Sequence, residues 1–105
     1  MWAGYYAFER DMEDICRYYS ELGIKGFKVD FMDRDDQPMV DFHYRGAAIA
    51  AKYHLLLDYH GTYKPTGLNR TYPNVVNFEG VHGLEQLKFA GSDKVDQVTY
   101  DVTMP

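Results

Sequence analysis

The stretch Lys28-Val29-Asp30-Phe31-Met32-Asp33 decides the fold, because it places an acid at the end of a short apolar segment. A buried strand is predicted over residues 26–32, and a charged segment follows it. An aspartate at the carboxyl end of such a strand, followed by a helix, is the arrangement in which α/β barrel enzymes keep their chemistry. A second acid, Glu85, lies near the end of a later apolar segment. Because parallel strands end at one edge of a sheet, Asp30 and Glu85 are the candidate catalytic pair.

Upstream of this strand, five apolar residues recur at spacings of four, three, four and three, which is one face of a helix. They are Phe8, Met12, Ile15, Tyr19 and Leu22. Gly23 follows the last of them and suits the left-handed residue that ends a helix. Cys16 lies on the same apolar face, so it is predicted to pack in the core rather than to act as a nucleophile.

The segment after the strand is predicted to be a second helix. Asp35 and Asp36 stand before Pro38, and both acids and proline suit the first turn of a helix. The predicted inner face combines apolar residues with small ones, which would let the helix lie close to a sheet. These residues are Met39, Phe42, Gly46, Ala47, Ala48, Ile49, Ala50, Ala51 and Tyr53.

Two further strands are predicted over residues 54–59 and 75–78. The residues between them, 61–74, contain two prolines and two glycines and are predicted to form a long loop. The order helix, strand, helix, strand, loop, strand is that of βαβ units, with a parallel sheet and right-handed crossovers. The strands are apolar without clear alternation, which predicts burial on both faces of the sheet.

Three strands and two helices cannot close a sheet into a barrel, because a TIM barrel needs about 250 residues. The chain, residues 1–105, is therefore predicted to be one partial catalytic domain of the α/β class. We interpret it as the central segment of a (β/α)8 TIM barrel, with about three parallel strands, two helices and long loops.

The composition narrows the class of partner. A formal net charge of −5 argues against nucleic acid, since phosphate binding needs a basic face. The aromatic fraction of 16% mildly favours carbohydrate, whose faces stack on such rings, although ordinary core residues would give the same fraction. The single cysteine excludes an internal disulfide, and the four histidines lack the spacing of zinc ligands. No apolar run long enough for a membrane span is present, and the N-terminus does not resemble a signal peptide.

Two more polar residues are predicted to lie near Asp30. Lys28 shares its face of the strand, because side chains two residues apart point the same way. A lysine on an apolar strand needs a partner, which Asp30 or a sugar hydroxyl could supply. His60 ends the next strand in the same manner, where it could bind a substrate hydroxyl or orient an acid. Asp30 itself could instead cap the turn that follows it.

Glu79 and Glu85 flank a short turn over residues 80–83. Two glutamates this close could both reach a hard cation such as calcium, which prefers several oxygen ligands. Alternatively, one of them is a surface acid. Glu85 suits the task of a general acid if its surroundings raise its pKa towards neutrality. The spacing alone leaves these uses open.

Five longer motifs, in this order, resemble the family 97 glycoside hydrolases. They are GIKGFKVDFMDRDDQ (residues 23–37), HGTYKPTGL (60–68), RTYPN (70–74), EGVHGLE (79–85) and YDVTMP (100–105). The resemblance implies an enzyme that cleaves α-linked galactosides or glucosides. It further implies a (β/α)8 barrel between an N-terminal β-sandwich and a C-terminal β-domain, both absent here, and calcium in the active site.

The same resemblance implies roles for single residues. In the retaining branch of the family an aspartate matching Asp30 is the nucleophile, and in the inverting branch a glutamate base stands at the position of Gly61. This chain therefore resembles the retaining, α-galactosidase-like branch, with Glu85 as the acid/base. Lys28 and His60 would bind the sugar, and Glu79 with Glu85 would bind calcium, at least one further ligand coming from the N-terminal domain.

The predicted function is thus hydrolysis of terminal α-galactosides by a calcium-dependent, retaining double displacement. The alternatives are an inverting α-glucosidase of the same family and a non-catalytic carbohydrate- or calcium-binding fragment. The expected partners are an oligosaccharide or α-galactoside substrate and the missing domains of the parent protein, and activity is expected of that parent rather than of this segment alone. For a full-length bacterial parent the resemblance implies the periplasm or secretion.

Overall fold

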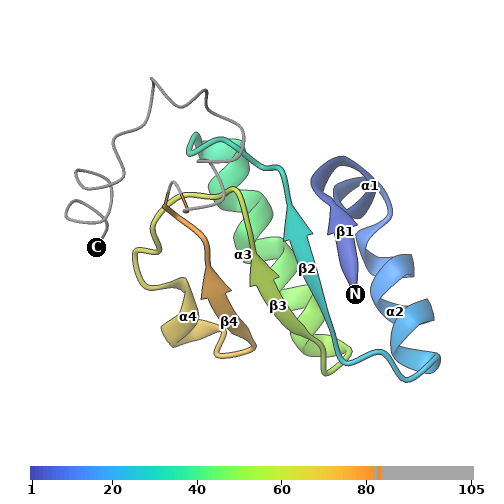
Figure 1. Ribbon diagram of the computed structural model, residues 1–105. Coiled ribbons are helices and arrows are strands. Elements are labelled where there is room, and N and C mark those ends of the chain that lie inside the picture. The colour runs from blue at the N-terminus through green and yellow to red at the C-terminus, as the bar shows by residue number, and fades with distance from the viewer. Residues whose placement is uncertain (82, 84–105) are drawn as a thin grey trace.

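The computed structural model of the chain describes residues 1–81 and Gly83 (Figure 1). Strands and helices alternate along most of this length. In chain order the elements are β1 (Trp2–Gly4), α1 (Tyr5–Arg10), α2 (Met12–Glu21), β2 (Gly26–Asp30), α3 (Gln37–Lys52), β3 (Leu56–Tyr59), α4 (Leu68–Thr71) and β4 (Val75–Phe78).

The four strands form one parallel sheet in the order β1-β2-β3-β4. Their arrows all point the same way, so their carboxyl ends lie along one edge (Figure 1). The predicted α/β class and the parallel sheet are therefore confirmed, but the described residues form four strands and four helices where about three strands and two helices were predicted, and α4 lies within the predicted loop 61–74. The additional strand, β1, has only three residues and no alternation, so its pairing with β2 defines it rather than any local pattern.

The helix predicted upstream of β2 is in fact two helices, α1 and α2. Asp11 separates them with a backbone conformation outside the helical region (φ −123°, ψ 30°). The apolar face continues across this break, because Phe8, Met12 and Cys16 are all buried. Leu22, however, is 62% exposed and does not belong to that face. One non-helical residue barely changes the spacing of an apolar face, so the sequence pattern does not reveal the break.

The strand at the predicted catalytic acid ends two residues earlier than expected, at Asp30 rather than Met32. Phe31 and Asp33 both have positive φ angles, of 69° and 47°, which residues with side chains rarely adopt. The chain therefore turns out of the sheet directly after Asp30. Similarly, β3 begins at Leu56, later than predicted.

The start of α3 agrees with the sequence prediction. Asp36 caps the helix by accepting a hydrogen bond from the Met39 backbone N–H (3.3 Å), and Pro38 lies in the first turn. Of the predicted small residues, Gly46, Ala47 and Ala50 are buried on its inner face, whereas Ala48 and Ala51 are only partly buried. A Cβ on Gly46 would lie 2.8 Å from Tyr59 Oη, so this glycine gives the tyrosine ring the room it needs beneath the helix.

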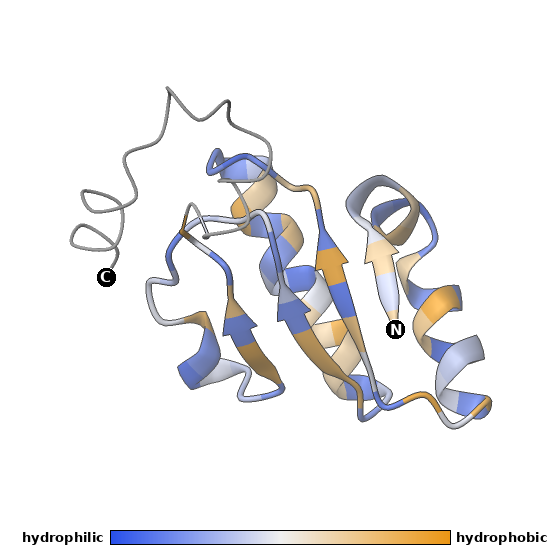
Figure 2. Ribbon diagram, viewed as in Figure 1, coloured by the Kyte–Doolittle hydropathy of each residue, from blue (hydrophilic) through white to orange (hydrophobic). Residues whose placement is uncertain are grey.

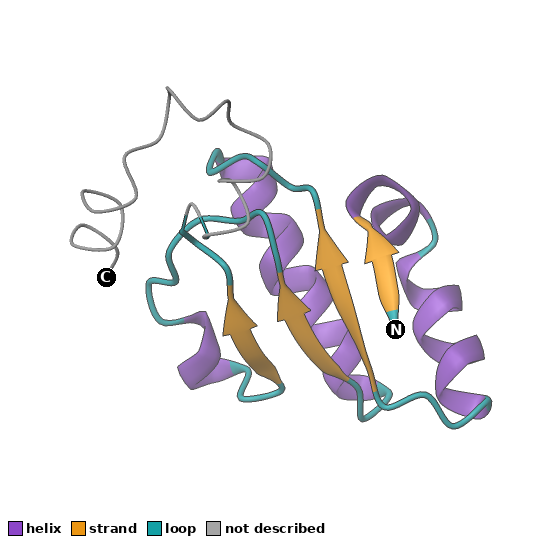
Figure 3. Cartoon of the chain, in the orientation of Figure 1, coloured by secondary structure: helices purple, strands orange, loops and turns teal. Residues whose placement is uncertain are grey.

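The core lies between the helices and one face of the sheet, and Figure 3 shows α3 running behind β2 and β3. Phe27, Val29, Leu57 and Tyr59 point into this core and are at most 3% exposed. Residues between them lie on the opposite face, where Leu56 is 49% exposed. Burial on both faces is therefore wrong for the described residues, which cover only one face. Figure 2 shows β3 changing from hydrophobic to hydrophilic towards its carboxyl end.

Cys16 is fully buried, as predicted. Burial raises the pKa of its thiol to about 11, so the thiol stays protonated at neutral pH and packs as an apolar group. Among the described helices, none has both the length and the apolar character that crossing a membrane requires.

His43 is the buried polar residue of α3 and connects the core to the loop after β3. Its Nδ1 lies 2.7 Å from the Met39 carbonyl oxygen, and its Nε2 lies 2.7 Å from Thr62 Oγ1. A carbonyl oxygen can only accept a hydrogen bond, so Nδ1 carries the proton and Nε2 accepts a hydrogen bond from the Thr62 hydroxyl. The neutral imidazole thereby satisfies both partners.

We expect His43 to make stability depend on pH. Burial lowers the pKa of His43 from its ordinary value of 6.5, so the unfolded chain takes up a proton before the folded chain does. Its contribution to the free energy of unfolding is therefore complete above that ordinary value and is lost as the pH falls below it. The free energy of unfolding can be measured in urea at a series of pH values. Its decrease towards low pH should be smaller for the His43→Asn variant, because asparagine keeps a donor but does not titrate. An unchanged decrease would contradict the assignment.

Candidate active site

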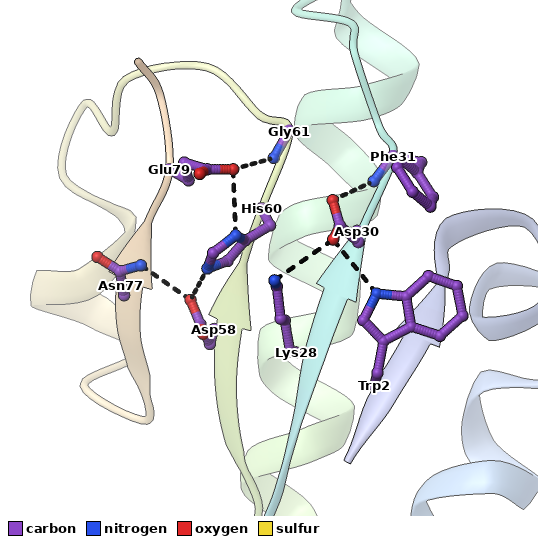
Figure 4. A network of polar contacts seen from close by, with 9 residues as sticks. All are labelled: Trp2, Lys28, Asp30, Phe31, Asp58, His60, Gly61, Asn77 and Glu79. Carbon is purple, nitrogen blue, oxygen red and sulfur yellow. Dashed lines mark hydrogen bonds and ion pairs between the residues drawn. The ribbon is translucent and has the colours of Figure 1, made fainter. Parts of the chain in front are cut away.

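The polar residues of the sheet gather on its open face near the carboxyl ends of the strands (Figure 4). The strand register explains why. Lys28 stands opposite Trp2 on β1 and opposite Asp58 on β3, and Asp58 stands opposite Asn77 on β4. These four side chains form a row across the sheet. Asp30, two residues beyond Lys28, lies on the same face nearer the edge.

Hydrogen-bond donors surround the carboxylate of Asp30. The Phe31 backbone N–H donates to Oδ1 (2.9 Å), and the Trp2 indole N–H donates to Oδ2 (3.2 Å). The Lys28 ammonium lies 3.6 Å from Oδ2, so Asp30, one of the two partners that the sequence left open for Lys28, is within ion-pair distance. The Asp30 side chain is 15% exposed, which leaves it accessible from the open face. A carboxylate with its charge balanced and its orientation fixed is suited to attack a nearby carbon.

His60 lies just past the end of β3 and bridges two carboxylates. Its Nε2 is 3.1 Å from Asp58 Oδ1, and its Nδ1 is 3.1 Å from Glu79 Oε2. Asn77 donates a further hydrogen bond to Asp58 Oδ1 (2.8 Å). The imidazole is thus held from both sides, and it links the ends of β3 and β4 on the face that carries Asp30.

Gly61 follows His60 and closes the edge of the sheet beside Asp30. Its φ angle is 58°, and a Cβ at this position would lie 3.0 Å from Asp33 Oδ1, 3.3 Å from the Phe31 backbone nitrogen and 3.5 Å from Asp30 Oδ1. Its backbone N–H donates to Glu79 Oε2 (3.3 Å). Glycine suits position 61 because it adopts this positive φ without strain and because a Cβ would crowd Asp33 and the Phe31 nitrogen.

A cavity of about 490 Å³ opens at this edge. It is lined by residues 33–35, 61–63 and 79–81 and by Gly83, which follow β2, β3 and β4 respectively. Ligand sites in open parallel sheets commonly lie outside the carboxyl ends of the strands, as this cavity does. Its volume is in the range of pockets that hold small ligands.

The described residues meet the requirements of a calcium site only in part. Glu79 offers a carboxylate at the cavity, and a Cβ on Gly83 would lie 3.7 Å from Glu79 Oε1, so the glycine leaves room beside this oxygen. Within residues 1–81 and Gly83, no group of three or more His, Cys, Asp or Glu side chains could hold a metal ion. Glu85, the predicted acid/base and second calcium ligand, lies outside the described residues.

The structure thus brings four of the five predicted site residues to one edge of the sheet: Lys28, Asp30, His60 and Glu79. Sequence reasoning missed Asp58 and Trp2. Asp58 could have been found, because it precedes His60 by two residues just as Lys28 precedes Asp30. Trp2 gave no such signal, since its contact with Asp30 joins residues 28 positions apart.

Comparison with known proteins identifies the family. A family model described as glycoside hydrolase 97 matches residues 1–81. A retaining alpha-galactosidase from Bacteroides thetaiotaomicron is 70% identical over 105 residues, which are all of this chain and 16% of that protein. A probable retaining alpha-galactosidase from Streptomyces bingchenggensis is 41% identical over 64 residues, which are 61% of this chain and 10% of that protein.

The chain therefore spans less than a fifth of the length of these relatives. The match to the family model nevertheless includes every described strand and helix, and with them the acid, the lysine and the histidine at the carboxyl edge of the sheet. By this match the chain belongs to glycoside hydrolase family 97.

Proposed function

We propose that this chain is the central segment of the catalytic barrel of a retaining α-galactosidase, as part of a longer polypeptide, called the whole protein below. The main observation is the carboxylate of Asp30, which ends β2 with donors on both oxygens and faces the open side of the sheet. The names of both relatives support the retaining mechanism and the galactoside substrate. Four parallel strands with helices on one face are compatible with part of a (β/α)8 barrel.

The proposed reaction is a double displacement. Asp30 attacks the anomeric carbon, the bond from that carbon to the leaving oxygen breaks, and Glu85 gives its proton to the leaving oxygen. Glu85 then takes a proton from water, and the water oxygen displaces Asp30 from the same carbon. The two acid groups of a retaining pair are about 5 to 5.5 Å apart, which is the separation proposed for Asp30 and Glu85.

Lys28 and His60 are proposed to bind the sugar. The Lys28 side chain is 42% exposed, and its ammonium has three N–H donors, so it can hold Asp30 and still donate to a hydroxyl. His60 is fixed between Asp58 and Glu79, which would hold its ring in one orientation on the face that carries Asp30.

Calcium is proposed to bind at Glu79 and Glu85, with a further ligand from outside this chain. When bound, it would add positive charge that helps to hold the substrate. Glu79 contributes an oxygen whose partners, His60 and the Gly61 N–H, hold the carboxylate in place. Calorimetric titration of calcium into the whole protein should give clearly weaker binding for Glu79→Gln than for the unchanged protein.

The inverting α-glucosidase is disfavoured by Gly61. An inverting reaction needs a second carboxylate that activates water, and in this family's inverting branch that base stands at the Gly61 position. A side chain there would crowd Asp33 and the Phe31 backbone nitrogen and would adopt an unfavourable backbone conformation. By resemblance, we also propose that the whole protein acts in the periplasm or after secretion.

The substrate proposal is tested by comparing two aryl glycosides. The whole protein should hydrolyse para-nitrophenyl α-galactoside with a kcat/KM at least about 100-fold above that for the α-glucoside, because a site that pairs buried polar groups with one hydroxyl rejects its epimer. A preference for the glucoside would overturn the proposal in favour of the α-glucosidase.

A further inference from the structure

The indole of Trp2 reaches Asp30 because of the residues around it on β1 and β2. Trp2 and Gly4 share the open face of β1, and Gly4 stands directly opposite Asp30. Because Gly4 has no side chain, the indole can lie across it, and a Cβ on Gly4 would be 3.5 Å from Trp2 Cη2. The ring thus extends along the strand towards the acid and presents its N–H to Oδ2 (Figure 4).

A second aromatic residue supports this position of the ring. Phe31 packs edge-on against Trp2, with ring centroids 5.8 Å apart and an interplanar angle of 73°. The positive φ of Phe31 turns the chain so that its ring stands beside the indole while its N–H holds Asp30 Oδ1. One turn therefore fixes both the carboxylate and the ring that donates to it.

Among the described side chains, the indole is the one whose donor is within hydrogen-bonding distance of the Asp30 carboxylate. The ammonium of Lys28 is further away, at 3.6 Å. An indole N–H can only donate, so it can hold a carboxylate oxygen but cannot take up a proton itself. Hydrogen bonds to charged groups are stronger than those between neutral groups.

We infer that Trp2 is a positioning residue for the displacement reaction, acting through Asp30. Its N–H fixes the plane of the carboxylate before attack. During attack, one carboxylate oxygen bonds to the anomeric carbon while the leaving oxygen of the substrate departs. The N–H then donates a hydrogen bond to the other oxygen of the resulting ester. When water later displaces the carboxylate from the sugar, the same N–H donates a hydrogen bond to the carboxylate as its negative charge returns. This role rests on the proposed function, in which Asp30 is the nucleophile.

The inference is tested by combining Trp2→Phe with Asp30→Gly in the whole protein. Trp2→Phe keeps an aromatic ring but removes the N–H, and it should lower kcat for para-nitrophenyl α-galactoside about tenfold with KM within about twofold. In Asp30→Gly, azide can enter the space left by the carboxylate. Its nitrogen bonds to the anomeric carbon, para-nitrophenolate leaves, and β-galactosyl azide forms.

The rate restored by azide separates the possible roles of Trp2. If Trp2 acts through Asp30, adding Trp2→Phe to Asp30→Gly should leave the azide-dependent rate within about twofold, because the carboxylate is already gone. An equal tenfold loss in both backgrounds would overturn the inference and would indicate that the ring contacts the sugar or only maintains the fold. If Asp30→Gly forms no galactosyl azide, the proposed function itself fails, and the inference fails with it.

A second variant tests whether the fall in kcat comes from a general loss of structure rather than from the missing N–H. Benzothienylalanine at position 2 keeps the bicyclic shape of tryptophan but has sulfur in place of the N–H. It should reproduce the tenfold fall in kcat with a melting temperature close to that of the unchanged protein. Full activity of this variant would overturn the inference, since the N–H would then have no role.

Discussion

Replacing Asp30 with asparagine in the whole protein should lower kcat at least about 10⁴-fold, as expected when a nucleophile is removed from a catalytic unit. The amide has nearly the same shape, and its one oxygen can still accept a hydrogen bond from either Phe31 or Trp2, although its NH2 group cannot replace the second acceptor. What it lacks is the negative charge that bonds to the anomeric carbon. Initial rates on para-nitrophenyl α-galactoside, with galactoside affinity measured by calorimetry, would separate the loss of chemistry from the loss of binding.

The matched control is Asp14→Asn. Asp14 is an exposed residue of α2 whose side chain pairs with Arg17, far from the carboxyl edge of the sheet. This change should leave kcat within about twofold, as surface changes usually do. If Asp30→Asn also kept its activity, Asp30 would have only the capping role left open by the sequence. If the unchanged protein had no turnover and the Asp30→Asn variant bound the galactoside with the same affinity, the chain would belong to a binding protein.

Gly61→Ala should lower kcat/KM about 100-fold, which is the size of effect that a small misplacement of catalytic groups produces. The added methyl would crowd Asp33 Oδ1 at 3.0 Å and the Phe31 backbone nitrogen at 3.3 Å, while Asp30 Oδ1, at 3.5 Å, would be in ordinary contact. The positive φ would add about 1 kcal/mol of backbone strain. The strain alone is small, so most of the loss should come from a shift of the Phe31 N–H, which holds Asp30 in place.

Gly23→Ala separates these two contributions. Gly23 has a similarly positive φ, of 87°, but nothing lies within 4 Å of a Cβ at this position. This variant should lower the melting temperature about as much as Gly61→Ala does and should leave kcat/KM unchanged. Equal activity of the two alanine variants would show that the room beside Asp30 does not matter.

The site could be predicted from the sequence where it depends on the period of a strand. Lys28 and Asp30 are two residues apart on an apolar segment, which is enough to place both on one face and the acid at its end. His60 and Glu79 follow later segments in the same way. Parallel pairing then brings all three strand ends together without further information.

Other features depend on contacts that no local pattern records. Three residues make up β1, and they become a strand because β2 offers them a partner. The indole of Trp2 reaches Asp30 only because of this pairing and because Gly4 leaves room. The early end of β2 is likewise set by Phe31 and Asp33, whose left-handed backbone is stabilised by surrounding contacts rather than by their own preferences.

The electrostatic arrangement also could not be predicted from residue types alone. His60 was a candidate for binding a hydroxyl or for orienting an acid, and both of its nitrogens lie against carboxylates. The histidine therefore ties β3 to β4 in addition to any contact with substrate.

The central claim, retention through attack by Asp30, is tested most directly by the anomer released first. Proton NMR of the whole protein acting on para-nitrophenyl α-galactoside, recorded before mutarotation, should show α-galactose as the initial product, because two displacements at one carbon restore its configuration. Initial β-galactose would contradict the account, since it would require a single displacement by water and leave Asp30 without its proposed role.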